Sequence, residues 1–213
     1  MGLFSRSGRP SDPFARVDPS PDELFYRAER RVTHIEPGAI AALRDLYAWL
    51  LPAGEPVLDL MSSWRSHLPP GLGPVTGLGM NLAEMNDNPQ LASTVVRNLN
   101  AEPALPFADE AFGAVVCAVS VQYLVRPFEV FAEVRRVTRP GGPVVVSFSS
   151  RCFPTKAVAA WREGESSAHR ALVRGYLEET GYERVTDEEL PSPDDPLWVV
   201  RGERPGLREV PAQ

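Results

Sequence analysis

Short apolar segments that alternate with helical segments most constrain the fold of this 213-residue chain. The apolar runs are continuous rather than alternating, which is typical of strands whose two faces are both covered. Between them, apolar residues recur at helical spacing, as in residues 127–138. This alternation predicts an α/β fold with a doubly wound, mostly parallel sheet. The five clearest strand segments are residues 56–60, 74–79, 94–99, 112–119 and 144–148.

Further elements are predicted on both sides of these runs. A capping box in which Ser20 caps and Glu23 closes predicts a helix start, and a second helix runs from Pro37 to Leu50. Residues 155–180 have a helical pattern that is interrupted near Gly164. Two weaker strands complete the sheet and bring the expected total to seven; they are residues 183–186 and 197–201.

The domain organisation follows from where the apolar content begins and ends. Residues 1–19 contain little apolar content and predict a flexible tail, and residues 203–213 predict a second one. We expect one domain over residues 20–202, with N-terminal helices over 20–52 and the core sheet over 56–202.

Charge and cysteine usage exclude several classes of function. The formal net charge is −6 and the basic residues form no stripe, so a nucleic-acid partner is disfavoured. No apolar run is long enough to span a bilayer, and Met1–Arg9 lacks the apolar core of a secretory signal. Cys117 and Cys152 match no metal-ligand spacing. We therefore expect a cytoplasmic protein with no membrane partner and no metal site.

The loops after the strands are where chemistry is expected. In an open parallel sheet, ligands bind outside the carboxyl ends of the strands, where the strand order reverses. The loops that follow the first four predicted strands are residues 59–64, 79–81, 98–100 and 120–123.

Three segments resemble the class I S-adenosylmethionine-dependent methyltransferases, in particular their type 11-like domain. Residues 105–116 (LPFADEAFGAVV) are similar to that family's LPF-x-D-x-x-F-D-x-V segment, and residues 136–142 (RVTRPGG) to its R-V-L-K-P-G-G turn. Residues 57–60 (VLDL) stand where the family has its first strand. The resemblance covers residues 37–150. It implies a Rossmann-like sandwich, with helices on both faces of a seven-stranded sheet, and methyl transfer from S-adenosylmethionine.

The resemblance also implies which residues bind the cofactor. The positions that match the family's cofactor loops are Asp59, Met61, Ser62, Ser63, Gly79, Met80, Asn81, Asn98, Leu99, Asn100, Ser120 and Tyr123. Among these, Asp59 is expected to face the ammonium group of the cofactor. The region of Phe25, Tyr26 and Arg31 often forms a lid in this family.

The sequence departs from the family at the cofactor loops. Residues 61–65 (MSSWR) replace a glycine-rich loop, and Gly79 replaces the acidic residue that holds the ribose hydroxyls. We expect compensation from a short helix over residues 64–68, whose N-terminus offers N–H groups to a carboxylate. Asn81 or Glu84 is expected to bind the ribose instead.

No catalytic residue is identified from the sequence. Of the three histidines, His67 is the best candidate for a general base because it follows the altered loop; His34 and His169 stand elsewhere. Gln122 either lines the site or is an ordinary loop residue. The remaining candidates are Trp64, which either stacks on a ligand or packs in the core, and Arg151, which either meets an anionic substrate or is solvated.

Two functions of different class follow. The first is an S-adenosylmethionine-dependent methyltransferase that acts on a small-molecule acceptor, with a homodimer as one option for its assembly. The second is a catalytically inactive methyltransferase-like binding or scaffolding protein, motivated by the missing glycines. An NAD-dependent oxidoreductase is disfavoured, because no G-x-G-x-x-G follows the first strand and no acidic residue ends the second.

Overall fold

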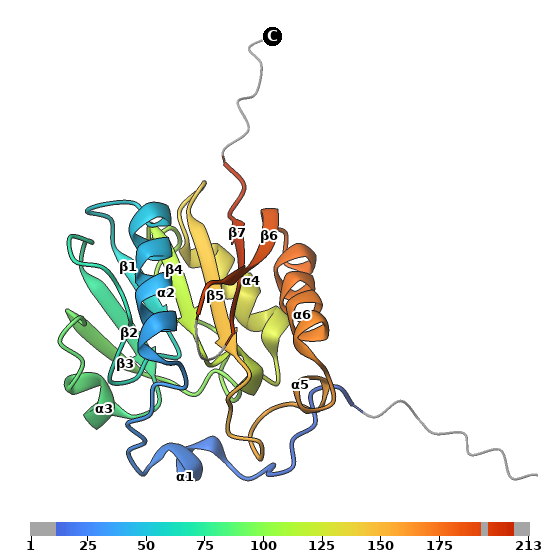
Figure 1. Cartoon of the computed structure of the whole chain (residues 1–213). Coiled ribbons are helices and arrows are strands. Elements are labelled where there is room, and N and C mark those ends of the chain that lie inside the picture. The colour runs from blue at the N-terminus through green and yellow to red at the C-terminus, as the bar shows by residue number, and fades with distance from the viewer. Residues whose placement is uncertain (1–11, 193–195, 207–213) are drawn as a thin grey trace, which may run out of the picture.

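A seven-stranded sheet in the order β3-β2-β1-β4-β5-β7-β6 forms the centre of the computed structural model, which describes residues 12–192 and 196–206 (Figure 1). Strands β1 to β5 pair in parallel, and β7 runs antiparallel between β5 and β6. The predicted α/β class and the mostly parallel sheet are confirmed. The strands are β1 (Val57–Leu60), β2 (Val75–Gly79), β3 (Ser93–Val96), β4 (Ala114–Ala118), β5 (Pro143–Ser149), β6 (Glu183–Leu190) and β7 (Leu197–Glu203).

Helices connect the strands and cover both faces of the sheet. They are α1 (Asp22–Tyr26), α2 (Pro37–Leu50), α3 (Leu82–Asn86), the 3-10 turn η1 (Val121–Tyr123), α4 (Pro127–Val137), α5 (Ala159–Arg162) and α6 (Ser166–Glu179). The expected capping box at the first helix is wrong: Pro21 occupies the N-cap without a side-chain bond. The Ser20 hydroxyl instead accepts a hydrogen bond from Lys156 Nζ at 3.3 Å.

The core has two halves because alternate residues of each buried strand point to opposite faces. On one face, Val115 and Val146 belong to a cluster that α4 and α6 cover. On the other, Val116 and Val145 belong to a cluster covered by α2. The strands are therefore apolar on both faces, as their continuous apolar runs predict.

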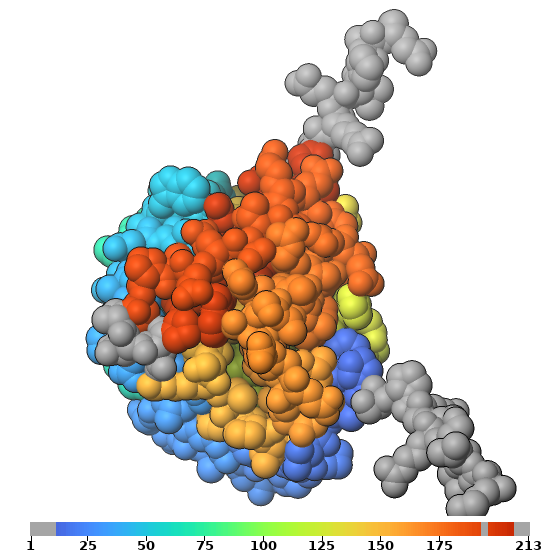
Figure 2. Space-filling model, turned by 45° about the vertical axis from the view of Figure 1, so that its right-hand side comes forward, coloured from blue at the N-terminus to red at the C-terminus, as the bar shows by residue number. Residues whose placement is uncertain are grey.

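The N-terminal segment, residues 12–36, packs across one end of the sheet. The backbone N–H of Ala159 donates to the Ala15 carbonyl at 2.8 Å, and that of Asp18 donates to the Thr155 carbonyl at 2.9 Å. Figure 2 shows this blue segment against the segment that follows β5. The predicted flexible tail over residues 1–19 is therefore wrong for residues 12–19, and residues 1–11 lie outside the described part.

The other chain end also differs from its prediction. Strand β7 continues to Glu203, and Arg204 pairs with the 141–142 turn through two backbone hydrogen bonds. The prediction of a tail is therefore wrong for residues 203 and 204, and residues 207–213 lie outside the described part, as do residues 193–195. No helix among the described residues is long and apolar enough to cross a membrane.

Strand β3 is shorter than the apolar run that predicts it. The strand ends at Val96, so residues 97–100 form a loop at the carboxyl end of the sheet. This places the polar side chains of Asn98 and Asn100 where a ligand of the sheet is expected.

Candidate functional site

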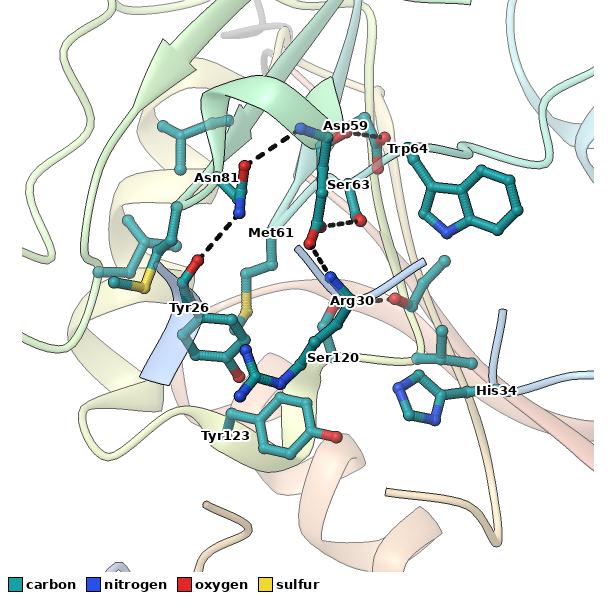
Figure 3. Close-up of a pocket in the computed structure, with 18 of the residues that line it drawn as sticks. Tyr26, Arg30, His34, Asp59, Met61, Ser63, Trp64, Asn81, Ser120 and Tyr123 are labelled. Carbon is teal, nitrogen blue, oxygen red and sulfur yellow. Dashed lines mark hydrogen bonds between the residues drawn. The ribbon is translucent and has the colours of Figure 1, made fainter. Parts of the chain in front are cut away.

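A pocket lies at the carboxyl ends of β1 to β4, under the N-terminal segment (Figure 3). It encloses a cavity of about 130 Å³. All twelve residues that the sequence nominates for cofactor binding line this pocket, so the four strand-end loops do meet at one site. That these residues hold a cofactor remains a prediction.

The loop after β1 folds back onto Asp59. The hydroxyls of Ser62 and Ser66 both donate to Asp59 Oδ2, at 2.5 and 2.6 Å. Asn88 donates to the Ser66 oxygen at 2.8 Å and to the Ser63 carbonyl at 2.9 Å, which ties the loop to the segment after α3. Burial raises the pKa of Asp59 to about 6, and the two serine hydroxyls oppose that shift. Asp59 thus organises the loop through one carboxylate oxygen.

Several non-glycine residues around this pocket have a positive φ, the left-handed backbone conformation that glycine adopts most easily. Of six such residues in the described ranges, four line the pocket: His34, Met61, His67 and Val119, with φ between 45° and 58°. Met61 stands in the loop where the family places glycine. Val119 is β-branched, for which this conformation is strongly disfavoured. Such strain clusters at functional sites because the surrounding structure has to enforce it.

Gly79 explains why the family's acidic residue is missing at the end of β2. A Cβ atom at this position would lie 2.2 Å from the Ser62 carbonyl oxygen, which leaves no room for a side chain. The Ser62 N–H donates to the Leu78 carbonyl at 2.8 Å, so the β1 loop lies directly on β2. The close approach that glycines allow in the family's β1 loop is made here at the end of β2.

The short helix predicted over residues 64–68 does not form. Residues 62–69 have irregular backbone, so there is no helix N-terminus to receive a carboxylate. The two serines before it donate to carboxylates instead of capping a helix: Ser62 donates to Asp59, and Ser63 donates to Glu84 Oε2 at 2.5 Å.

Polar side chains of the pocket also bind the N-terminal segment. The amides of Asn98 and Asn100 donate to Glu23 and Asp22, at 2.7 and 2.9 Å. Asn81 donates to the Tyr26 carbonyl at 3.0 Å (Figure 3). Its Oδ1 accepts from the Glu84 N–H and caps α3. The pocket is therefore closed by hydrogen bonds to the segment that covers it.

The sequence does not predict one positively charged residue of the pocket, Arg30. The Arg30 guanidinium lies over the Phe25 ring at 3.9 Å and donates to the carbonyls of Phe25 and Ala28. No carboxylate pairs with it among residues 12–192 and 196–206. Figure 3 shows this side chain beside Tyr26 and Tyr123. The only local signal for this site is the cluster of aromatic and arginine residues at 25–31.

The other candidates separate into those that reach the pocket and those that do not. His34, His67, Trp64 and Tyr26 line it, whereas Gln122 does not. Gln122 is buried, and its amide donates to the Val119 carbonyl at 3.0 Å. This hydrogen bond helps to hold Val119 in its left-handed conformation.

The remaining four candidates do not line the pocket, and one of them, Phe25, packs against the Arg30 guanidinium. His169 stacks on Trp161 at 4.0 Å. Arg31 and Arg151 line a second, more open hollow. The described residues contain no group of three or more side chains that could hold a metal ion.

Comparisons with known proteins agree with this architecture. Residues 75–146 match a family described as a methyltransferase domain. A search of curated proteins found no match. Similar solved structures include a SAM-dependent methyltransferase from Aquifex aeolicus, at 15% identity, 85% coverage of this chain, 96% coverage of that chain and a TM-score of 0.57.

Two further solved structures have the same fold, but one comes from a complex with an activator and the other is a cyclase. One is from the complex between the Haloferax volcanii Trm112 methyltransferase activator and a methyltransferase: 16% identity, coverage of 79% of this chain and 90% of that one, TM-score 0.60. The other is the [4+2]-cyclase SpnF: 14% identity, coverage of 77% and 81%, TM-score 0.58. The chain therefore has the fold of the class I S-adenosylmethionine-dependent methyltransferases, and its residues 75–146 match their methyltransferase domain.

Proposed function

We propose that this protein is an S-adenosylmethionine-dependent methyltransferase that acts on a small molecule. The observation that carries the proposal is the convergence of all twelve nominated residues on one pocket, at the carboxyl ends of four parallel strands. In this fold that edge of the sheet is the ligand-binding edge.

The donor set of the pocket fits the polar ends of the cofactor. Asp59 uses only Oδ2 for its two serine bonds, which leaves Oδ1 to accept from the ammonium group. The Arg30 backbone N–H donates to Glu84, whereas its guanidinium pairs with no carboxylate in the described ranges and supplies a charged donor for the carboxylate group of the cofactor. Glu84 accepts from the ribose hydroxyls in place of the acidic residue that Gly79 excludes, through the lone pairs that remain beside its bonds to the Ser63 hydroxyl and the Arg30 backbone N–H. Admission of the cofactor requires the N-terminal segment to give up part of its hydrogen bonds.

The chain supplies orientation rather than covalent chemistry. When bound, S-adenosylmethionine supplies an electrophilic methyl group on a positively charged sulfur. The pocket residues hold the two reactants in line and exclude water, which lowers the barrier through positioning. Because the net charge is −6 and no basic stripe is present, a small acceptor is favoured over a nucleic acid.

A titration with S-adenosylmethionine and S-adenosylhomocysteine tests the proposal. Calorimetry should show binding of both to the wild-type chain. Glu84→Gln keeps the side-chain shape but removes the charge, so binding should weaken by roughly tenfold to a hundredfold. Glu129→Gln is the matched control, because Glu129 is an exposed residue of α4 that pairs with Arg126. Absence of binding at millimolar ligand would overturn the proposal.

A binding or scaffolding protein without catalysis is the second candidate. The observation that favours it is that Asn81, Asn98 and Asn100 are already hydrogen-bonded to the N-terminal segment. The calorimetric titration separates the two candidates, because a scaffold of this kind has no need to bind the cofactor.

A further inference from the structure

A second hollow of about 450 Å³ opens beside the cofactor pocket. Four residues line both spaces and form the boundary between them: Val32, Thr33, His34 and Trp64. Arg31 and Arg151 complete the lining of the second hollow. A compound in this hollow would therefore lie beside His34, at the boundary with the cofactor pocket.

His34 is held rigidly at the junction of the two spaces. Its φ is 58°, and its carbonyl accepts a hydrogen bond from the buried Ser149 hydroxyl at 2.9 Å. Its imidazole packs edge-on against Phe153, with ring centres 4.7 Å apart. Neither ring nitrogen hydrogen-bonds to another residue in the part of the chain that the structure describes. The imidazole is thus fixed in place while its nitrogens stay available.

The charges around His34 keep the ring neutral at neutral pH. Burial lowers its pKa, and the positive charge of Arg151 lowers it further. Arg151 comes from the segment after β5 and pairs with Glu36 at 2.6 Å, while Arg31 pairs with Glu29 and Asp87. The other charged side chains that line the adjoining pocket are Asp22, Arg30, Asp59, Arg65, Glu84 and Arg97.

We infer that the second hollow receives the methyl acceptor, that the acceptor is a planar compound with an acidic hydroxyl of the phenol class, and that His34 accepts the proton of that hydroxyl. The inference rests on the proposed function. Trp64 lines both spaces, and the Arg65 guanidinium lies over its indole at 4.3 Å, so a flat ring would stack on the opposite face. A neutral imidazole accepts a proton from such a hydroxyl, while Arg31 and Arg151 stay paired with the carboxylates of Glu29, Asp87 and Glu36.

The reaction balances with S-adenosylmethionine as the co-reactant. His34 takes the hydroxyl proton as the acceptor oxygen forms a bond to the methyl carbon. The electron pair of the broken carbon–sulfur bond stays on sulfur, whose positive charge is thereby neutralised. The imidazolium then releases its proton to solvent through the open hollow. His34 therefore replaces His67, the candidate favoured by sequence position, since His67 lines only the inner pocket.

Binding of 4-nitrophenol to the cofactor-free protein tests the inference without measuring turnover. Ionisation of this phenol changes its colour near neutral pH, so absorbance reports whether the bound probe has lost its proton. Wild-type protein should bind the probe and shift it towards the phenolate. His34→Asn should bind about tenfold more weakly and lose the colour shift. Asparagine tolerates the left-handed conformation of residue 34, so this variant should fold.

Two further histidine variants sharpen the result. His169→Asn is the matched control outside both spaces and should behave as the wild type does. Loss of the colour shift in His67→Asn but not in His34→Asn would overturn the inference, as would failure of the wild type to bind the probe. The chain has three histidines, so NMR spectra of the His67→Asn and His169→Asn variants identify two of the three imidazole resonances and leave the third to His34. In the wild type, the His34 resonance should move to its protonated position when the probe binds.

The outcomes also separate the inference from the proposed function. If the cofactor binds but 4-nitrophenol does not, only the acceptor assignment fails. If 4-nitrophenol binds with ionisation but the cofactor does not, the proposed function fails and the phenol site stands.

Discussion

At the scale of single residues, Gly79 and the β1 loop depend on each other. The loop avoids glycine by placing Met61 in a left-handed conformation, and it then lies so close to β2 that only glycine fits at residue 79. The missing glycines and the missing ribose carboxylate are therefore one structural change rather than two.

Gly79→Ala tests this dependence. The added Cβ would lie 2.2 Å from the Ser62 carbonyl, so the loop must shift and the free energy of unfolding should fall by about 1–3 kcal/mol. Urea denaturation measures the change. Gly206→Ala is the control, because nothing lies within 4 Å of its Cβ position. Equal stability of the two variants would show that the β1 loop does not rest on β2.

The buried carboxyl of Asp59 makes stability depend on pH. Its pKa is raised to about 6 in the folded state, so the folded state binds this proton more tightly than the unfolded state does. The free energy of unfolding should therefore fall as pH rises from 3.8 to about 6.

Asp59→Asn removes this titration, and above pH 7 the variant should be more stable than the wild type by about 1–3 kcal/mol. Denaturation at a series of pH values measures the difference. Asp45→Asn, at an exposed site of α2, should follow the wild-type curve. A less stable Asp59→Asn variant above pH 7 would mean that the ionised carboxylate stabilises the loop.

At this scale the sequence predicts which residues meet but not what they bind. Asp59, Asn81 and Asn100 are predictable because each follows a strand of a parallel sheet, and such ends meet at one edge. The partners of these side chains are not predictable. Asn100 donates to Asp22, which is far away in the sequence, and a local sequence pattern does not predict such a contact.

At the scale of elements, the N-terminal segment is anchored by Lys156, the only lysine of the chain. This side chain is fully buried, and its ammonium group pairs with Asp18 at 3.0 Å and with Asp22 at 3.3 Å. It also donates to the Ser20 carbonyl at 2.8 Å. Asp22 in turn binds Asn100, so the anchor is connected to the pocket.

Lys156→Met should release this segment. Removal of one partner from a buried ion pair costs up to about 3–5 kcal/mol, and the cost here should lie below that limit because Asp22 keeps its shorter ion pair with Arg16, at 2.6 Å. Hydrogen exchange of residues 12–30 should become faster while β5 keeps its protection. Arg126→Met removes an exposed ion pair instead and should leave exchange unchanged. Unaltered exchange in Lys156→Met would show that other contacts hold the segment.

The elements themselves are largely predictable, and their exceptions have physical causes. The continuous apolar runs of β1, β4 and β5 identify buried strands from the sequence alone. Residues 12–19 contain few apolar residues, and for that reason the sequence predicts a tail there, which is wrong. This segment is held by backbone hydrogen bonds and by Lys156, and neither is visible in a hydropathy pattern.

At the scale of the whole molecule, a ligand in the pocket should couple segments that are far apart in sequence. S-adenosylhomocysteine should slow hydrogen exchange by at least about tenfold in both the N-terminal segment and the strand-end loops, since both enclose the pocket. The edge strand β6 lies at the far side of the sheet and should not change. Mass spectrometry of the exchanged protein measures this. Protection of the loops without the N-terminal segment would show that the segment is displaced by the ligand.

The contacts of the N-terminal segment also determine when the site can form during translation. Residues 15, 18 and 20 bind residues 155–159, so about 135 residues separate the two sides of these contacts. The ribosome has to release the chain beyond residue 159 before the N-terminal segment can dock. Until then the strand-end loops have no cover, and a nascent chain that stops after β5 has most of the sheet but an open site.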